Sequence, residues 1–256
     1  MIRVLSLVLL CGLLGHPAEA ATNAARSCLE RFFAGDLKAA QVECEPLATI
    51  GEPAGNFVVG ALAEMGANGA PQPALAERGY RAAASEGFAP AQTVLAVFLQ
   101  RGAPTSEHCA ADLAEAARWL AAAAGQGYAP AQVRLGITLS EGLGVPSDPA
   151  AAAGQFRAAA QQGSADALFL LGGLYRTGQG VPQDNGLAGL FFAQAAERGH
   201  PAAAHNLGVL LNLAGRPDAA KPWLAKGGES GVGMVTGADQ PDPAVTEQAK
   251  PFTCAN

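Results

Sequence analysis

The sequence has few charged residues and few aromatic ones. Charged residues make up 15% and aromatic residues 6% of the 256 positions, and only four are lysines. With a net charge of -6, the chain lacks the basic surface that nucleic-acid binding requires. A disordered chain would be more polar than this one, whose hydrophobic fraction is 50%. The small aromatic fraction also argues against a β-sandwich or a β-barrel.

Alanine and glycine dominate instead. Alanine occupies 58 positions and glycine 32. Because alanine has the highest helix propensity, the composition predicts an all-α fold. The small size of its side chain implies that those helices pack closely.

The first 20 residues have the layout of a secretory signal peptide. Arg3 precedes the apolar stretch Val4–Leu14, and Ala18 and Ala20 are the small residues that a signal peptidase needs. The stretch is shorter than the ~20 apolar residues that span a bilayer, which disfavours a membrane anchor. A lipidated Cys11 is disfavoured because a large residue precedes it. We expect cleavage after Ala20 and a periplasmic or secreted protein that does not span the membrane.

The cysteines that remain after cleavage are Cys28, Cys44, Cys109 and Cys254. An even number in an exported chain suggests two disulfides, and the absence of a C-x-x-C spacing argues against a zinc site or a redox motif. Four cysteines allow three connectivities. Cys28 and Cys44 bracket two expected short helices, 29–33 and 37–43, whose connecting turn would bring these cysteines together. This pairing leaves Cys109 to bond Cys254.

An internal repeat organises most of the chain. The anchors of the repeat, separated by 36, 40, 36 and 36 residues, are Gly51, Gly87, Gly127, Gly163 and Gly199. A small residue recurs four and nine positions after each anchor, and valine or leucine eight positions after it. Alanine recurs eleven positions before each anchor, and a bulky side chain or, once, Cys44 seven positions before it. These offsets are helical, so each repeat is expected to contain two helices.

The third repeat illustrates the expected boundaries. Its first helix should run over 113–124 and end in a left-handed glycine turn, and its second should run over 130–140. The connector Gly142–Asp148 has the form G-x-G-V-P-x-D and recurs as Gly178–Asp184. Its glycines supply unusual backbone angles, and its proline prevents the helix from continuing. Each connector ends in an aspartate that we expect to cap the next helix.

This pattern resembles the Sel-one-like repeat (SLR) family, a relative of the tetratricopeptide repeat (TPR). The matching segments, from complete to degenerate, are Ala116–Asp148, Ala152–Asp184, Ala76–Gly102, Ala188–Gly215 and Ala40–Gly66, and Asp218–Gly231 resembles a closing helix. The resemblance implies a right-handed α-solenoid of five to six antiparallel helix pairs with a concave face. We assign residues 21–231 to this solenoid and 232–256, which lack an apolar period, to an irregular tail.

The sequence contains no recognisable catalytic or metal motif. H-E-x-x-H, G-x-S-x-G, S-x-x-K and K-T-G are all absent. His200 and His205 are five positions apart and should lie on different helix faces, so we expect a solvent-facing turn histidine and a helix-surface histidine rather than a metal site. No cofactor is expected.

The resemblance therefore indicates a non-enzymatic adaptor that binds a protein or peptide partner. The candidate binding residues, which lie on the first helix of a repeat at positions not needed for packing, are Arg78, Arg81, Arg118, Arg157 and Gln194. Their arginines could hold a carboxylate. The alternative is a cell-wall-related hydrolase or a penicillin-binding or β-lactamase-like activity, because some cysteine-rich secreted members of the family are associated with it.

Overall fold

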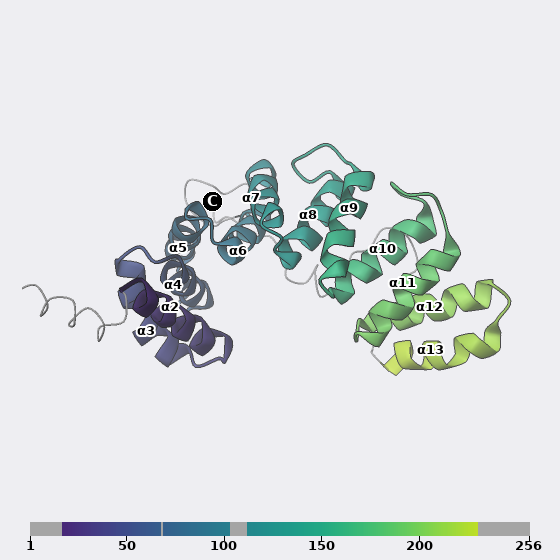
Figure 1. The fold of residues 1–256 in the computed structure, drawn as a ribbon, viewed down its shortest axis with the longest axis horizontal. Coiled ribbons are helices and arrows are strands. Elements are labelled where there is room, and N and C mark those ends of the chain that lie inside the picture. The colour runs from purple at the N-terminus through teal and green to yellow at the C-terminus, as the bar shows by residue number, and fades with distance from the viewer. Residues whose placement is uncertain (1–16, 68, 103–111, 230–256) are drawn as a thin grey trace, which may run out of the picture. The chain divides into compact units, whose positions relative to one another are not determined.

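A computed structural model describes residues 17–67, 69–102 and 112–229, and within these ranges all regular secondary structure is helical. The helices are α2 (Pro17–Phe33), α3 (Leu37–Thr49), α4 (Pro53–Met65), α5 (Pro73–Ser85), α6 (Ala89–Gln100), α7 (Leu113–Gly125), α8 (Ala129–Glu141), α9 (Pro149–Gln161), α10 (Ala165–Thr177), α11 (Asn185–Glu197), α12 (Pro201–Leu213) and α13 (Pro217–Glu229) (Figure 1). Helices that follow one another in the chain pack together from α2 to α5 and from α7 to α13. The predicted all-α solenoid of helix pairs is confirmed.

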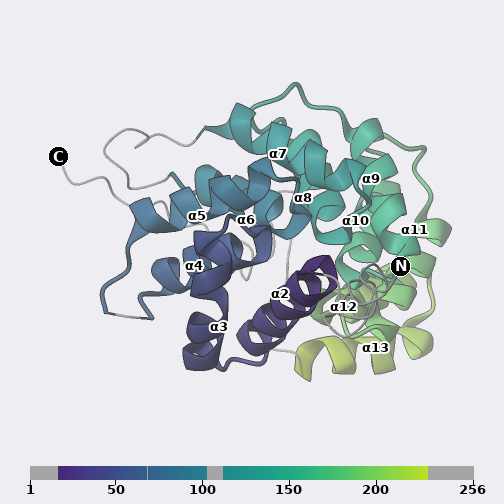
Figure 2. The ribbon, with the colours of Figure 1, turned by 60° about the vertical axis from the view of Figure 1, so that its left-hand side comes forward.

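The chain forms two compact units whose boundary lies inside α6, after Leu95. In the first unit, α2 packs against α3 and α4, and α4 packs against α5. Figure 2 shows α2 lying alongside α3. In the second unit, each helix from α7 to α13 packs against the next, as the run of hairpins in Figure 1 shows.

The predicted helix boundaries in the third repeat are confirmed to within one residue. The helices expected over 113–124 and 130–140 are α7 and α8. All five anchor glycines have positive φ angles, between 82° and 91°, which a residue with a Cβ atom rarely adopts. The anchor is therefore the left-handed turn that reverses the chain between the two helices of a repeat.

The second glycine of the connector is required by a close approach. Gly144 has φ of 71°, and a Cβ atom built on it would meet the backbone of Leu113 and Ala114 at the start of α7. Gly180, in the next connector, meets the backbone of Pro149 and Ala150 in the same way. The G-x-G spacing thus lets each connector lie against the first helix of its own repeat.

The core is built from small residues facing large ones. The alanine eleven positions before each anchor is fully buried in all five repeats. The glycine nine positions after an anchor lies against the bulky side chain seven positions before the next anchor: a Cβ on Gly172 would be 2.6 Å from a ring carbon of Phe192. Gly136 meets Phe156 in the same way, and Gly208 meets Leu224 on α13. The contact between Gly208 and Leu224 shows that α13 continues the repeat as its closing helix.

The connector aspartates cap the helices that follow them, as predicted. Asp148 Oδ1 accepts a hydrogen bond from the Ala151 amide at 2.9 Å. Asp184 Oδ1 accepts from the amides of Gly186 and Leu187 at 2.8 and 2.9 Å. These bonds satisfy amides that have no partner within the helix. The carboxylates are thereby accounted for by structure rather than by acid–base chemistry.

Replacing Asp184 by alanine is expected to lower the free energy of unfolding by about 1 kcal/mol, because two first-turn amides lose their acceptor. Asp184→Ser, which keeps an acceptor oxygen, should lose clearly less. Urea unfolding of both variants measures the difference. Equal losses would mean that the side-chain oxygen is not what stabilises α11.

The N-terminal region differs from the expectation. The helix expected over 29–33 is the end of α2, which already begins at Pro17 and extends across the expected cleavage point at Ala20. Ser27 and Arg31 on α2 both bond Glu43 of α3, at 2.6 and 3.3 Å. The sequence signal was weak here because α2 precedes the first repeat and therefore lacks its periodic glycines. The rest of the expected signal peptide, residues 1–16, lies outside the described residues.

Candidate binding surfaces

The first helix of each repeat leaves a row of side chains in solvent. Positions eleven, seven and four before the anchor face the core, so positions nine and six before it lie on the opposite face of the same helix. Four of the five predicted binding residues occupy this outward row, and Gln194, five positions before its anchor, lies beside it. The row contributes nothing to the glycine–ring contacts of the core.

In the second unit the row carries two arginines. Arg118 on α7 and Arg157 on α9 are exposed, and Gln194 on α11 is half-buried. Within the described residues, no hydrogen bond or ion pair engages the guanidinium of Arg118 or Arg157, and none joins them to each other. The three side chains thus lie on alternate helices of one continuous stack, but the structure does not bring them into a single contact cluster.

In the first unit the two predicted arginines differ in their surroundings. Arg78 on α5 is exposed, whereas Arg81 is half-buried and its Nε lies 2.8 Å from Glu77 Oε1. Glu77 is itself buried, with 7% of its surface exposed. Because the Arg81 guanidinium is engaged in this ion pair, Arg78 is better placed than Arg81 to bind a ligand.

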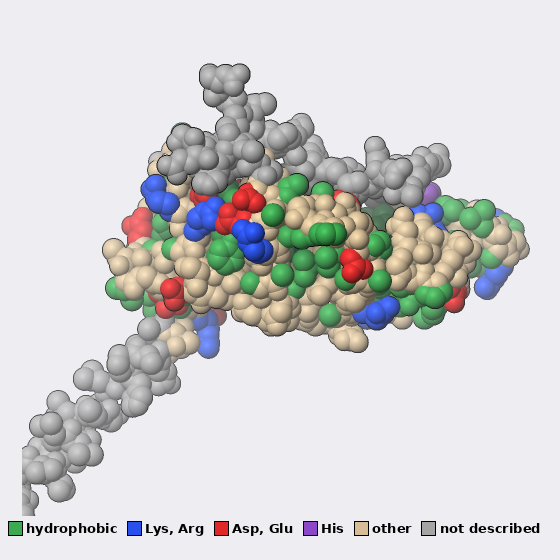
Figure 3. All heavy atoms as spheres, turned by 90° about the horizontal axis from the view of Figure 1, so that it is seen from above, with side chains coloured by type: hydrophobic (Ala, Val, Ile, Leu, Met, Phe, Trp, Pro, Cys, Tyr) green, Lys and Arg blue, Asp and Glu red, His purple; other side chains and the backbone are tan. Residues whose placement is uncertain are grey.

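The charges on the surface are mixed in sign. On the face seen in Figure 3, basic and acidic side chains lie close together in places, between broader areas of hydrophobic and uncharged atoms. A mixed surface offers separate charged contacts rather than a field of one sign. It suits a protein partner better than a polyanion.

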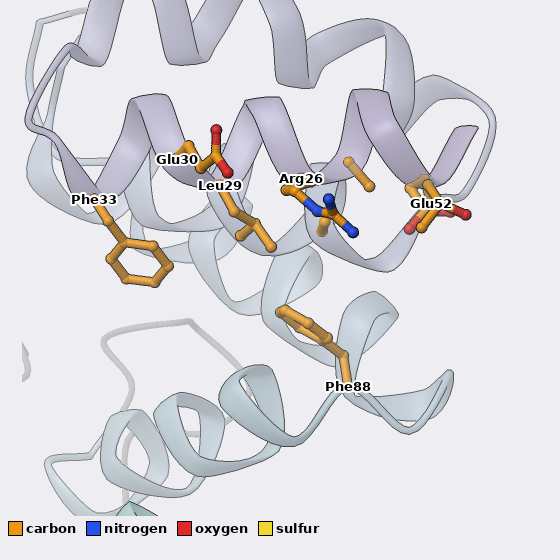
Figure 4. A pocket seen from close by; sticks show the side chains of 9 residues that line it. Arg26, Leu29, Glu30, Phe33, Glu52 and Phe88 are labelled. Carbon is orange, nitrogen blue, oxygen red and sulfur yellow. The ribbon is translucent and has the colours of Figure 1, made fainter. Parts of the chain in front are cut away.

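The first unit contains an apolar hollow of about 610 Å³ that the sequence did not indicate. Figure 4 shows Leu29 and Phe33 of α2 directed toward the space that Phe88 enters from the opposite side. Phe33 is 70% exposed, and the Phe88 ring packs edge-on against Phe57 with centroids 5.6 Å apart. Arg26, Glu30 and Glu52 add charge at its border.

A second hollow, of about 430 Å³, lies in the second unit between α8 and the start of α10. Its lining residues are Ala129, Pro130, Val133, Arg134, Ile137, Gln162, Gly163, Ser164 and Asp166. The guanidinium of Arg134 is half-buried, and this burial, together with the positive charge of Arg101, lowers its pKa from the ordinary value. The sequence did not identify Arg134 as a candidate binding residue, because it lies on the second helix of its repeat, where the recurring residues indicate packing positions alone.

The expectation that His200 faces solvent is wrong. His200 is only 8% exposed, and its ring stacks on Phe169 with centroids 4.1 Å apart and 15° between the planes. Its Nε2 lies 3.8 Å from Asp166 Oδ1. A turn position is not exposed here because α10 of the preceding repeat passes beside it. His205 is half-buried on α12.

Of the four cysteines, Cys28 and Cys44 form a disulfide between α2 and α3. Cys109 and Cys254 lie outside the described residues, so their expected bond stays a prediction. The described residues contain no group of three or more His, Cys, Asp or Glu side chains arranged to hold a metal ion. None of the described helices is both long enough and apolar enough to cross a membrane.

Comparison with known proteins identifies the type of repeat. The family model described as Sel1 repeat matches residues 89–128, 129–164 and 165–200. A crystal structure of a Sel1 repeat protein from Oxalobacter formigenes is 26% identical, with a TM-score of 0.69 over 81% of this chain and 86% of that one. The c5321 protein, a protective antigen of uropathogenic Escherichia coli with an SLR fold, is also 26% identical and aligns over 84% of this chain and 55% of its own, with a TM-score of 0.41. No curated protein matched the sequence significantly.

Proposed function

Because the chain belongs to the Sel1-like repeat family, whose members are typically scaffolds for protein interaction, we propose that it is an adaptor that binds a protein or peptide partner in the bacterial cell envelope. The observation that carries the proposal is the outward row of the second unit. Arg118 and Arg157 lie on the first helices of two consecutive repeats, with exposed guanidinium groups that no described residue engages. Such groups are available to a partner's carboxylates, and in a TPR-like superhelix the first helices line the concave side.

Two observations support export. Residues 1–20 have the charge, apolar stretch and small residues of a cleavable signal, and Cys28 is bonded to Cys44. Disulfides persist mainly in oxidising compartments such as the periplasm. We therefore assign 1–20 to a signal peptide, 21–231 to the repeat solenoid and 232–256 to a tail.

The Sel1-repeat fold is generally a non-catalytic scaffold, and we include the absence of enzymatic activity in the proposal. The sequence lacks the serine and lysine motifs of β-lactamases and penicillin-binding proteins. Purified protein should therefore leave a chromogenic β-lactam unhydrolysed. Hydrolysis that follows the protein through a second purification would contradict this part of the proposal.

Site-specific photocrosslinking tests partner binding. We expect a photoreactive amino acid at position 118 or 157 to capture the same partner in the bacterium that carries the gene. The matched control is position 176, because Arg176 is also exposed but lies in the last turn of a second helix, α10. A partner captured at 118 and 157 but not at 176 supports the outward row as the binding surface. Capture at all three positions, or at 176 alone, contradicts it.

A further inference from the structure

The residue that follows each anchor glycine fills a recurring position between repeats. In the second to fifth repeats this residue is Phe88, Tyr128, Ser164 and His200. In the second and the fifth repeat its ring packs against an aromatic side chain of the preceding repeat. Phe88 lies edge-on to Phe57 with centroids 5.6 Å apart, and His200 stacks on Phe169 at 4.1 Å. Phe57 and Phe169 both lie six positions after the anchor of the preceding repeat.

The fourth repeat has neither ring. Ser164 takes the place of the ring, and Val133 takes the place of Phe57 or Phe169. The Ser164 hydroxyl is already used to cap α10, accepting from the Ala167 amide at 3.2 Å. Two small side chains thus stand where the second and the fifth repeat each have a pair of rings, and the hollow of about 430 Å³ lies at this place.

Of the described residues that line this hollow, Arg134 alone has a cationic side chain. Arg134 lies seven positions after its anchor, where the next repeat has the half-buried, apolar Leu170. In the part of the chain that the structure describes, no residue forms a hydrogen bond or an ion pair with the Arg134 side chain. A half-buried guanidinium without an acceptor is unfavourable, and the nearby positive charge of Arg101 adds to the cost. An anion bound in the hollow would offset both effects.

The rest of the lining narrows the choice of anion. Val133 and Ile137 make one wall apolar. Gln162 is held in place by hydrogen bonds to the Gly127 carbonyl and Gln132 Oε1, both at 2.9 Å. Asp166, whose side chain is 74% exposed, brings a negative charge to the rim and lies near His200. Asp166 and the net charge of -6 repel a doubly charged phosphate more strongly than a singly charged carboxylate, and a carboxylate matches the planar guanidinium.

We propose that the hollow between α8 and α10 binds the carboxyl-terminal residue of a partner polypeptide, with Arg134 holding the carboxylate and the Val133–Ile137 wall receiving an aliphatic side chain. This inference deepens the proposed adaptor function and rests on it. The second and the fifth repeat fill the equivalent space with a pair of rings, which distinguishes them from this site. The site lies on the second helix of a repeat and is therefore distinct from the outward row.

Three small probes distinguish the sources of a carboxylate. N-acetyl-leucine carries a terminal carboxylate and an aliphatic side chain, N-acetyl-leucinamide lacks the charge, and N-acetyl-glutamic acid α-amide carries only a side-chain carboxylate. We expect N-acetyl-leucine to shift the Arg134 Nε–Hε resonance saturably at millimolar concentrations, and the other two to bind at least about tenfold more weakly. Absence of saturation with N-acetyl-leucine, equal binding of the amide, or preference for the glutamate probe would each overturn the proposal.

Variants copied from the next repeat provide the controls. Arg134→Leu installs the residue found at Leu170, and Val133→Phe with Ser164→His installs the pair found at Phe169 and His200. Both should fold and both should lose the N-acetyl-leucine shift of the surrounding amides, whereas Arg176→Gln, at an exposed residue that does not line the hollow, should retain it. Arg134→Leu should also raise the melting temperature by a few degrees, because it removes the half-buried charge. Probe binding that survives Arg134→Leu would overturn the proposal.

The probe titration requires no natural partner. If N-acetyl-leucine binds as expected while photocrosslinking captures nothing, the adaptor function fails and the carboxylate site stands. If crosslinking succeeds while N-acetyl-leucine does not bind, the site fails and the adaptor function stands.

Discussion

Gly172→Val is expected to destabilise the second unit by about 3 kcal/mol, the upper part of the usual range for overpacking, and to lower the melting temperature by roughly 5–10 °C. A Cβ atom at this position would stand 2.6 Å from a ring carbon of Phe192, and that ring is completely buried. The ring cannot turn away, because α10 and α11 pack directly against each other around it. Thermal and urea unfolding measure the loss.

The adjacent glycine supplies the control. A Cβ atom on Gly173 would meet nothing within 4 Å, and Gly173 lies in the same helix. Gly173→Ala should therefore stabilise the protein by about 0.5–1 kcal/mol, the ordinary gain in helix propensity. If Gly173→Ala and Gly172→Val changed stability equally, the close helix contact would not be the reason why glycine recurs at this position of the repeats.

A compensating change tests the contact itself. In the second repeat the position of Gly172 is held by Ala96, and the bulky residue that follows in register is Leu120 rather than a phenylalanine. Gly172→Ala should destabilise the protein, and adding Phe192→Leu should restore part of the loss, because a smaller side chain makes room for the methyl group. Strictly additive losses in the double-mutant cycle would refute a direct coupling between the two positions.

Removing the disulfide is expected to have an effect of similar size but confined to the N-terminus. The bond between Cys28 and Cys44 closes a loop with a sequence separation of 16, which contributes about 3 kcal/mol in the chain-entropy account. Cys44 occupies the position where later repeats place a bulky core side chain, so this covalent bond replaces a glycine–ring contact. The exposed Arg31–Glu43 ion pair between the same helices can contribute only little.

Hydrogen exchange separates a local effect from a global one. In Cys28→Ala/Cys44→Ala the amides of α2 should lose protection, while those of α10 should not change, because a solenoid transmits stability mainly between neighbours. Uniform loss of protection along the chain would contradict this view.

Mass spectrometry of the non-reduced mature protein should find no free thiol, and a free Cys28 would refute the bond.

The repeat could be predicted from the sequence in detail because each of its recurring residues is needed for a turn, a cap or a contact within a few positions of it. The anchor glycines were identified by their spacing, and each has the positive φ angle that only glycine readily adopts. Asp148 and Asp184 were identified as caps because a cap depends on residues three positions away at most. Ser164 differs from Phe88, Tyr128 and His200 at the equivalent position, and this difference was a signal for the hollow that only an alignment of the repeats with one another could provide.

The sequence by itself determined the helix pairs of the repeats and their order, since periodic small and large residues act over a few turns of helix. Only the tertiary structure decided which side chains between repeats meet. His200 is buried by stacking of the repeats although it lies at a turn, and Arg134 is half-buried beside a space that no ring fills. These outcomes depend on contacts between residues some 30 positions apart, which fall into place only when one repeat stacks on the next.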